Sequence, residues 1–139
     1  MIKPTVLVLD DDAAIRDMVS EELEMEGYRV LKTADGFEGL SLFEQWHPNA
    51  IVLDLLMPRM SGFEFLHRLD LQFGRSCPVV VLSATLDDQM IKACLDAGVR
   101  TILDKPFSLS RLRSAVRSAV EKDAGETSEK IEARPEGDR

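Results

Sequence analysis

The sequence has few of the residues that build disulfide frameworks or metal clusters, and it has no long hydrophobic run. Its 139 residues include two cysteines, Cys77 and Cys94, without the spacing of a zinc site, and two histidines. We therefore expect neither a disulfide framework nor bound zinc, and a reducing cytoplasm is the default location. The longest aliphatic runs, residues 6–9 and 79–82, are too short to cross a bilayer. The N-terminus does not have the pattern of a secretory signal, so we expect a cytoplasmic protein without membrane contact.

Positive charge is also scarce. The chain has 25 acidic and 17 basic residues, which gives a formal net charge of −8. A nucleic-acid-binding protein needs a basic surface, so we expect no direct contact with nucleic acid. No glycine-rich phosphate loop follows the first apolar segment, which argues against a nucleotide-binding fold of that kind. The contents of 30% charged and 45% hydrophobic residues are ordinary for one soluble globular domain.

Short apolar segments alternate with longer amphipathic segments along most of the chain. Asp12 can cap the first amphipathic segment, and Gly27 can end it in a left-handed conformation. The short segments predict strands at residues 5–10, 29–33, 50–54, 78–83 and 100–104. The amphipathic segments predict helices at residues 13–26, 36–46, 62–73, 87–97 and 108–121.

Five strand–helix pairs with continuous apolar strands indicate a sheet that is buried on both faces. Such strands favour a parallel arrangement between two layers of helices, so the predicted fold class is an open, doubly wound α/β sheet. We expect one domain over residues 1–121. Residues 122–139 are polar and charged, with Ile131 as their one large aliphatic residue, and they predict a flexible tail.

Side chains of complementary chemistry close or directly follow four of the five predicted strands. Open parallel sheets bind ligands beyond the carboxyl ends of their strands, so these side chains should share one edge. Each of these side chains alone would fit a turn residue, a helix cap or a solvated residue equally well. Together they suit a hard cation and a tetrahedral anion. The sequence thus predicts a metal-assisted phosphoryl site with a carboxylate nucleophile. The residues are Asp10, Asp11 and Asp12, then Asp54, then Ser83 and Ala84, then Lys105 and Pro106.

These residues stand in four motifs, and in this order the motifs resemble the receiver domain of two-component response regulators. The motifs are VLVLDDD at 6–12, IVLDLLMP at 51–58 with Gly62, VVLSA at 80–84, and KPF at 105–107. The resemblance covers residues 5–121. It implies the flavodoxin-like (βα)5 fold of the chemotaxis regulators, with strand order 2-1-3-4-5.

The resemblance also implies the roles of the acidic residues. Asp54 would accept a phosphoryl group from a histidine kinase or a histidine phosphotransfer protein. Asp11, Asp54 and the backbone carbonyl of Leu56 would ligate Mg²⁺, and Asp10 would act through a metal-bound water. The protein would then be a phosphoacceptor switch that assists its own phosphorylation and dephosphorylation, and not an enzyme in the turnover sense.

Further residues would bind the phosphoryl group and transmit its arrival. Ser83, the backbone amide of Ala84 and Lys105 would contact phosphoryl oxygens, and the peptide bond before Pro106 would be cis. Ile102 departs from the family pattern, because an aromatic residue that swings inward on activation often stands at this position. Transmission would then depend on the loop that contains Ser83 or on backbone shifts.

The resemblance implies protein partners, and it leaves alternatives open. A downstream protein would bind the face formed by the fourth helix, the fifth strand and the fifth helix, and we expect a monomer or a weak homodimer. The chain would act alone, or it would be the N-terminal receiver of a longer regulator, with residues 122–139 as a linker. A phosphatase of the haloacid-dehalogenase kind is disfavoured, because Leu56 stands where that family needs an aspartate.

Overall fold

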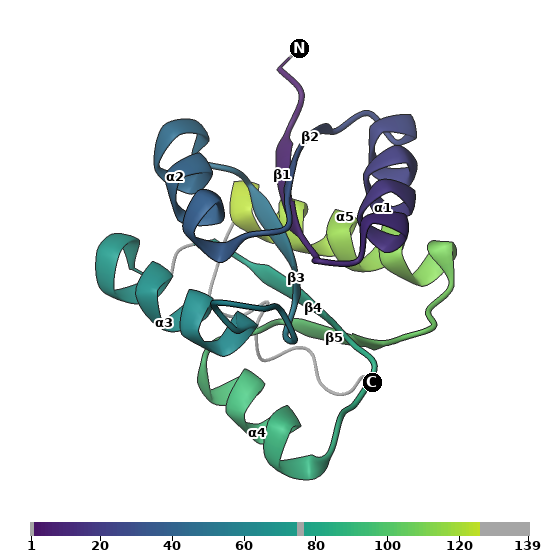
Figure 1. Ribbon diagram of the computed structural model, residues 1–139. Coiled ribbons are helices and arrows are strands. Elements are labelled where there is room, and N and C mark those ends of the chain that lie inside the picture. Colours follow the sequence, from purple (N-terminus) through teal and green to yellow (C-terminus); the bar gives the residue numbers. More distant parts are fainter. Residues whose placement is uncertain (1, 75–76, 126–139) are drawn as a thin grey trace.

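The structure is a computed structural model that describes residues 2–74 and 77–125, with side chains up to residue 121. Five strands alternate with five helices along this part of the chain (Figure 1). The strands are β1 (Thr5–Leu9), β2 (Arg29–Thr33), β3 (Ala50–Asp54), β4 (Val79–Ser83) and β5 (Thr101–Asp104). The helices are α1 (Ala13–Met25), α2 (Gly36–Trp46), α3 (Gly62–Phe73), α4 (Asp88–Asp96) and α5 (Leu109–Gly125).

The end of α5 is the one boundary that differs clearly from prediction. All the other predicted ends lie within one residue of the observed ends, whereas α5 continues past Glu121 to Gly125. The added residues before Gly125 are lysine, aspartate and alanine, none of which breaks a helix. The remainder of the predicted tail, residues 126–139, lies outside the described residues.

The strands form one parallel sheet in the order β2-β1-β3-β4-β5, which confirms the predicted fold class. Helices α2, α3 and α4 cover one face of the sheet, and α1 and α5 cover the other (Figure 1). Alternate residues of each strand point to opposite faces. In β1, for example, Leu7 and Leu9 pack towards α2 and α3, whereas Val6 and Val8 pack towards α1 and α5.

The sheet register places the ends of neighbouring strands side by side. Leu9 of β1 pairs with Leu53 of β3, so the residues that follow them leave the sheet at the same edge. The predicted cap at this edge is also present, because the Asp12 carboxylate accepts hydrogen bonds from the backbone N–H groups of Ala14 and Ile15. Within the described part of the chain, no helix is long and apolar enough to span a membrane.

Candidate phosphoryl-acceptor site

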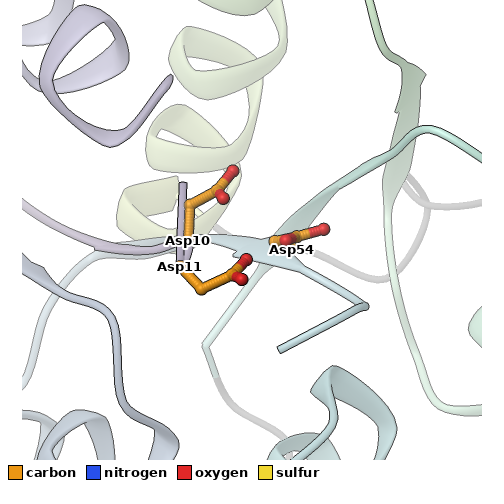
Figure 2. Close-up of side chains that lie close together, drawn as sticks. All are labelled: Asp10, Asp11 and Asp54. Carbon is orange, nitrogen blue, oxygen red and sulfur yellow. The ribbon is translucent and has the colours of Figure 1, made fainter. Parts of the chain in front are cut away.

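Three carboxylates meet where β1 and β3 end. Asp10 and Asp11 follow β1, Asp54 closes β3, and one oxygen from each lies within 4.8 Å of the other two (Figure 2). Asp10 and Asp54 are buried, whereas Asp11 is exposed. The structure therefore brings together the acidic residues that the sequence placed at separate strand ends.

Lys105 joins this acidic cluster from the loop after β5. Its ammonium nitrogen lies 3.0 Å from Asp10 Oδ2 and 3.6 Å from Asp54 Oδ1, and its side chain is only 14% exposed. The Lys105 backbone N–H donates to the carbonyl of Ser83 at 2.8 Å, which ties this loop to the end of β4. The peptide bond between Lys105 and Pro106 is cis, as the resemblance implied.

Burial and charge repulsion set the protonation of Asp54. Burial, together with the nearby Asp10 carboxylate, raises the pKa of Asp54 from 3.8 to about 6. The Lys105 ammonium and the backbone N–H of Leu56, which donates to Asp54 Oδ1 at 3.3 Å, act in the opposite direction. Asp54 is therefore ionised near neutral pH, and a cation bound beside it would favour that ionised form further.

Protein groups already hold Asp10 from several directions. Its carboxylate accepts hydrogen bonds from the Asp12 backbone N–H at 2.9 Å and from Lys105 at 3.0 Å. Its backbone carbonyl accepts a 2.8 Å hydrogen bond from Nη1 of Arg16. Carboxylate oxygens are the hard ligands that Mg²⁺ prefers, so the donor set fits this cation. Asp11 and Asp54 are the better candidates for direct ligation, because the Asp10 carboxylate is committed to these donors.

Arg16 was not among the residues predicted from the sequence, because no side-chain motif marks a contact with a backbone carbonyl. Arg16 lies near the start of α1, where the helix dipole disfavours a positive charge. The structure shows that its guanidinium donates instead to the backbone carbonyl of Asp10.

The other predicted phosphoryl contacts lie at the same edge, but Ser83 is engaged within its own loop. The buried Ser83 hydroxyl donates to the Thr85 carbonyl at 3.2 Å and accepts from the Thr85 N–H at 3.4 Å. Ala84 is exposed, and Ile102 is partly buried against the core under α2, α3 and α4. Leu56 is 56% exposed, and its carbonyl remains a predicted ligand.

Gly62 allows α3 to start directly against the site. Its N–H donates to the Leu55 carbonyl at 2.8 Å, and a Cβ added here would lie 2.7 Å from both the Asp54 carbonyl oxygen and the Leu55 Cα. Backbone atoms cannot yield as a flexible side chain can. Gly62→Ala should therefore destabilise the protein by about 2 kcal/mol or more, measured by urea denaturation.

Gly36→Ala is the matched control for this prediction. A Cβ at Gly36 would meet the flexible side chain of Met60, with its sulfur at 2.6 Å, and should cost roughly 1 kcal/mol. Equal losses of stability in the two variants would contradict the claim that the backbone of Asp54 and Leu55 requires glycine at position 62.

Known proteins are similar to this chain in both sequence and fold. The family described as response regulator receiver domain matches residues 6–117 of this chain. The probable transcriptional regulator ycf27 of Porphyridium aerugineum is 37% identical over 120 residues, which cover 86% of this chain and 49% of that protein. Response regulator MprA of Mycobacterium tuberculosis is 37% identical over 126 residues, covering 88% of this chain and 54% of that protein. This chain thus spans about half the length of these curated relatives.

Solved structures agree with the sequence matches. Chemotaxis protein CheY4 of Vibrio cholerae matches with a TM-score of 0.80 at 30% identity, over 85% of this chain and 99% of that chain. A CheY-like receiver domain protein of Methanospirillum hungatei matches with a TM-score of 0.84 at 25% identity, over 91% of this chain and all of that chain. With the acidic cluster and Lys105 at the carboxyl edge of a 2-1-3-4-5 sheet, the chain belongs to the response regulator receiver domains of two-component signalling.

Proposed function

We propose that Asp54 accepts a phosphoryl group from a phosphohistidine and that this event switches the protein's affinity for a downstream partner. The donor is a sensor histidine kinase or a histidine phosphotransfer protein, and the reaction takes place in the cytoplasm. One observation carries the proposal. The Asp10 and Asp11 carboxylates and the Lys105 ammonium converge around the buried Asp54, whose pKa of about 6 leaves it ionised at neutral pH.

The chemistry is an in-line transfer between two nucleophiles. An ionised oxygen of Asp54 attacks phosphorus, the P–N bond to the donor histidine breaks, and its electron pair returns to the imidazole, which takes up a proton. The product is an aspartyl phosphate. Mg²⁺ held by Asp11, Asp54 and the Leu56 carbonyl, with Asp10 behind a water, would offset the charge on the phosphoryl oxygens. The Lys105 ammonium lies within reach of the same region and would pair with one of these oxygens.

The switch begins at Ser83. Its hydroxyl now donates to the Thr85 carbonyl, and a phosphoryl oxygen is a stronger acceptor because it is charged. Turning the hydroxyl towards Asp54 breaks the bond to Thr85 and draws in the loop between β4 and α4, where the Ala84 amide can reach another oxygen. A coupling of about 1–3 kcal/mol is enough for a useful response. Ile102 offers no aromatic ring to rotate, so this loop carries the signal to the face formed by α4, β5 and α5.

Transfer from a histidine-phosphorylated donor protein tests the proposal. Wild-type protein should become labelled when Mg²⁺ is present, and chelation of the cation with EDTA should prevent labelling. Asp54→Asn should remain unlabelled, whereas Asp17→Asn, which alters an exposed α1 carboxylate paired with Lys32, should be labelled as wild type is. Labelling of Asp54→Asn would place the acceptor elsewhere and overturn the proposal.

A further inference from the structure

We propose that Arg16 is a positioning residue for the cation site, and that its guanidinium fixes the peptide plane between Asp10 and Asp11 so that Asp11 faces Asp54. The inference rests on the proposed function, because it concerns the cation which that function requires. Arg16 lies on the second turn of α1, and its Nη1 reaches back to the Asp10 carbonyl oxygen at 2.8 Å.

The hydrogen bond acts on the residue that precedes Asp11. The carbonyl of Asp10 and the N–H of Asp11 belong to one rigid peptide unit, so holding the oxygen sets the direction in which the chain enters Asp11. The Asp11 side chain is exposed and therefore receives no restraint from burial. Its direction depends strongly on the backbone that carries it, and Arg16 anchors that backbone on the N-terminal side.

The residues on either side of Asp11 are held by several groups, and Arg16 is one of them. Asp10 is held through its carboxylate by Lys105 and by the Asp12 N–H. The Asp12 side chain caps α1. The backbone carbonyl of Asp12 accepts a 2.9 Å hydrogen bond from the backbone N–H of Arg16. Arg16 thus contacts both ends of the acidic turn, through its backbone at Asp12 and through its side chain at Asp10.

The charge of Arg16 alone would have the opposite effect on a cation. A positive group near the site repels a divalent ion, so removing it should tighten binding if charge dominates. The pKa of Asp54 is set by burial, by the adjacent carboxylates, by Lys105 and by the Leu56 N–H, and Arg16 is not among these causes. The positioning role therefore predicts weaker Mg²⁺ binding when Arg16 is replaced, whereas its charge alone predicts tighter binding.

Titration of the metal-free protein with Mg²⁺, followed through the amide chemical shifts of residues 10–12, separates the two effects. Arg16→Met keeps the aliphatic stem and removes the donor, and should raise the Mg²⁺ dissociation constant about tenfold or more. Arg16→Lys retains a donor and should recover part of the affinity. Lys32→Met removes an exposed cation whose ammonium pairs with Asp17, and should change the affinity by less than about twofold.

A second readout distinguishes positioning from a general loss of structure. The metal-free Arg16→Met variant should keep the wild-type amide chemical shifts in the five strands and in α4, whereas the shifts of residues 10–12 should move. If Arg16→Met does not fold, Arg16→Leu, which also removes the donor, carries the same expectations.

The outcomes also separate this inference from the proposed function. Unchanged or tighter Mg²⁺ binding by the Arg16 variants would overturn the inference and leave the proposed function standing. A wild-type protein that does not bind Mg²⁺ would instead overturn the proposed function, and the role of Arg16 with it.

Discussion

Replacing Asp54 by asparagine is expected to make the protein more stable near neutral pH while abolishing phosphorylation. Asp54 is 4% exposed and its carboxylate lies beside that of Asp10, and these conditions raise its pKa from 3.8 to about 6. Keeping such a group ionised in the folded state costs roughly 2–3 kcal/mol. Asp54→Asn keeps the shape of the side chain and removes the charge, so urea denaturation at about pH 8 should show a gain of roughly that size.

The gain should depend on pH in a defined direction. In the unfolded chain Asp54 titrates near 3.8, and in the folded protein it titrates near 6. Between these values the folded state binds more protons, so the stability that Asp54 contributes falls as pH rises through this window. The advantage of Asp54→Asn should therefore be full above about pH 7 and should disappear below about pH 4.

Asp17→Asn provides the control for this prediction, because it removes a carboxylate that is 55% exposed and pairs with Lys32 on the surface. Its stability should stay within about 0.5 kcal/mol of wild type at both pH values. A loss of stability in Asp54→Asn near pH 8 would contradict the account, because it would mean that the Asp54 carboxylate stabilises the fold.

Lys105→Met is expected to destabilise the protein by about 3 kcal/mol near neutral pH. The substitution keeps most of the aliphatic stem but leaves Asp10, which is fully buried, and Asp54 without the ammonium that lies 3.0 and 3.6 Å from them. Since Lys105 lowers the pKa of Asp54, its loss should raise that pKa further above its usual range. Urea denaturation and a carboxyl carbon titration would measure the two effects.

The same variant also tests the switch. Lys105→Met should still become phosphorylated on Asp54 to some extent, because the nucleophile and the other carboxylates remain. The amide shifts of residues 83–85 should then move much less on phosphorylation than in wild type. An unchanged response at these residues would mean that Lys105 has only a structural role.

Lys92→Met serves as the matched control for stability. Lys92 pairs with Asp96 within α4 at 3.3 Å, and its side chain is 77% exposed. Its replacement should cost less than about 0.5 kcal/mol, because solvent screens such pairs. Adding Asp10→Asn to Lys105→Met should restore much of the lost stability. If it does not, repulsion between the carboxylates is not the cause of the loss.

Most of the fold could be predicted, because the apolar spacing and the helix-ending residues of the sequence agree with the observed helices and strands. Apolar strands such as β3 are buried along their whole length, which indicated a sheet covered on both faces. Residues that disfavour helix indicated where helices end. Gly27, for example, follows α1 and adopts a left-handed conformation with a φ of +99°. The end of α5 could not be predicted, because residues 122–124 carry no breaker and their charged composition also fits a tail.

The candidate site could be predicted in part, because parallel strands bring their carboxyl ends to one edge. That rule placed Asp10, Asp54 and Lys105 together before any contact was known. It could not predict the bond from Arg16 to the Asp10 carbonyl, because backbone acceptors carry no side-chain signature. Nor could it show that Ser83 is bonded to Thr85, since a hydroxyl can rotate to either partner.

Intact-mass spectrometry after incubation with Mg²⁺ and acetyl phosphate tests the central claim most directly. Wild-type protein should gain one phosphoryl group, and Asp54→Asn should gain none under the same conditions. Reversal by hydroxylamine, which cleaves acyl phosphates, would identify the product as an aspartyl phosphate. A phosphoryl group that persists in Asp54→Asn would contradict the account, because the buried carboxylate at the end of β3 would then not be the acceptor.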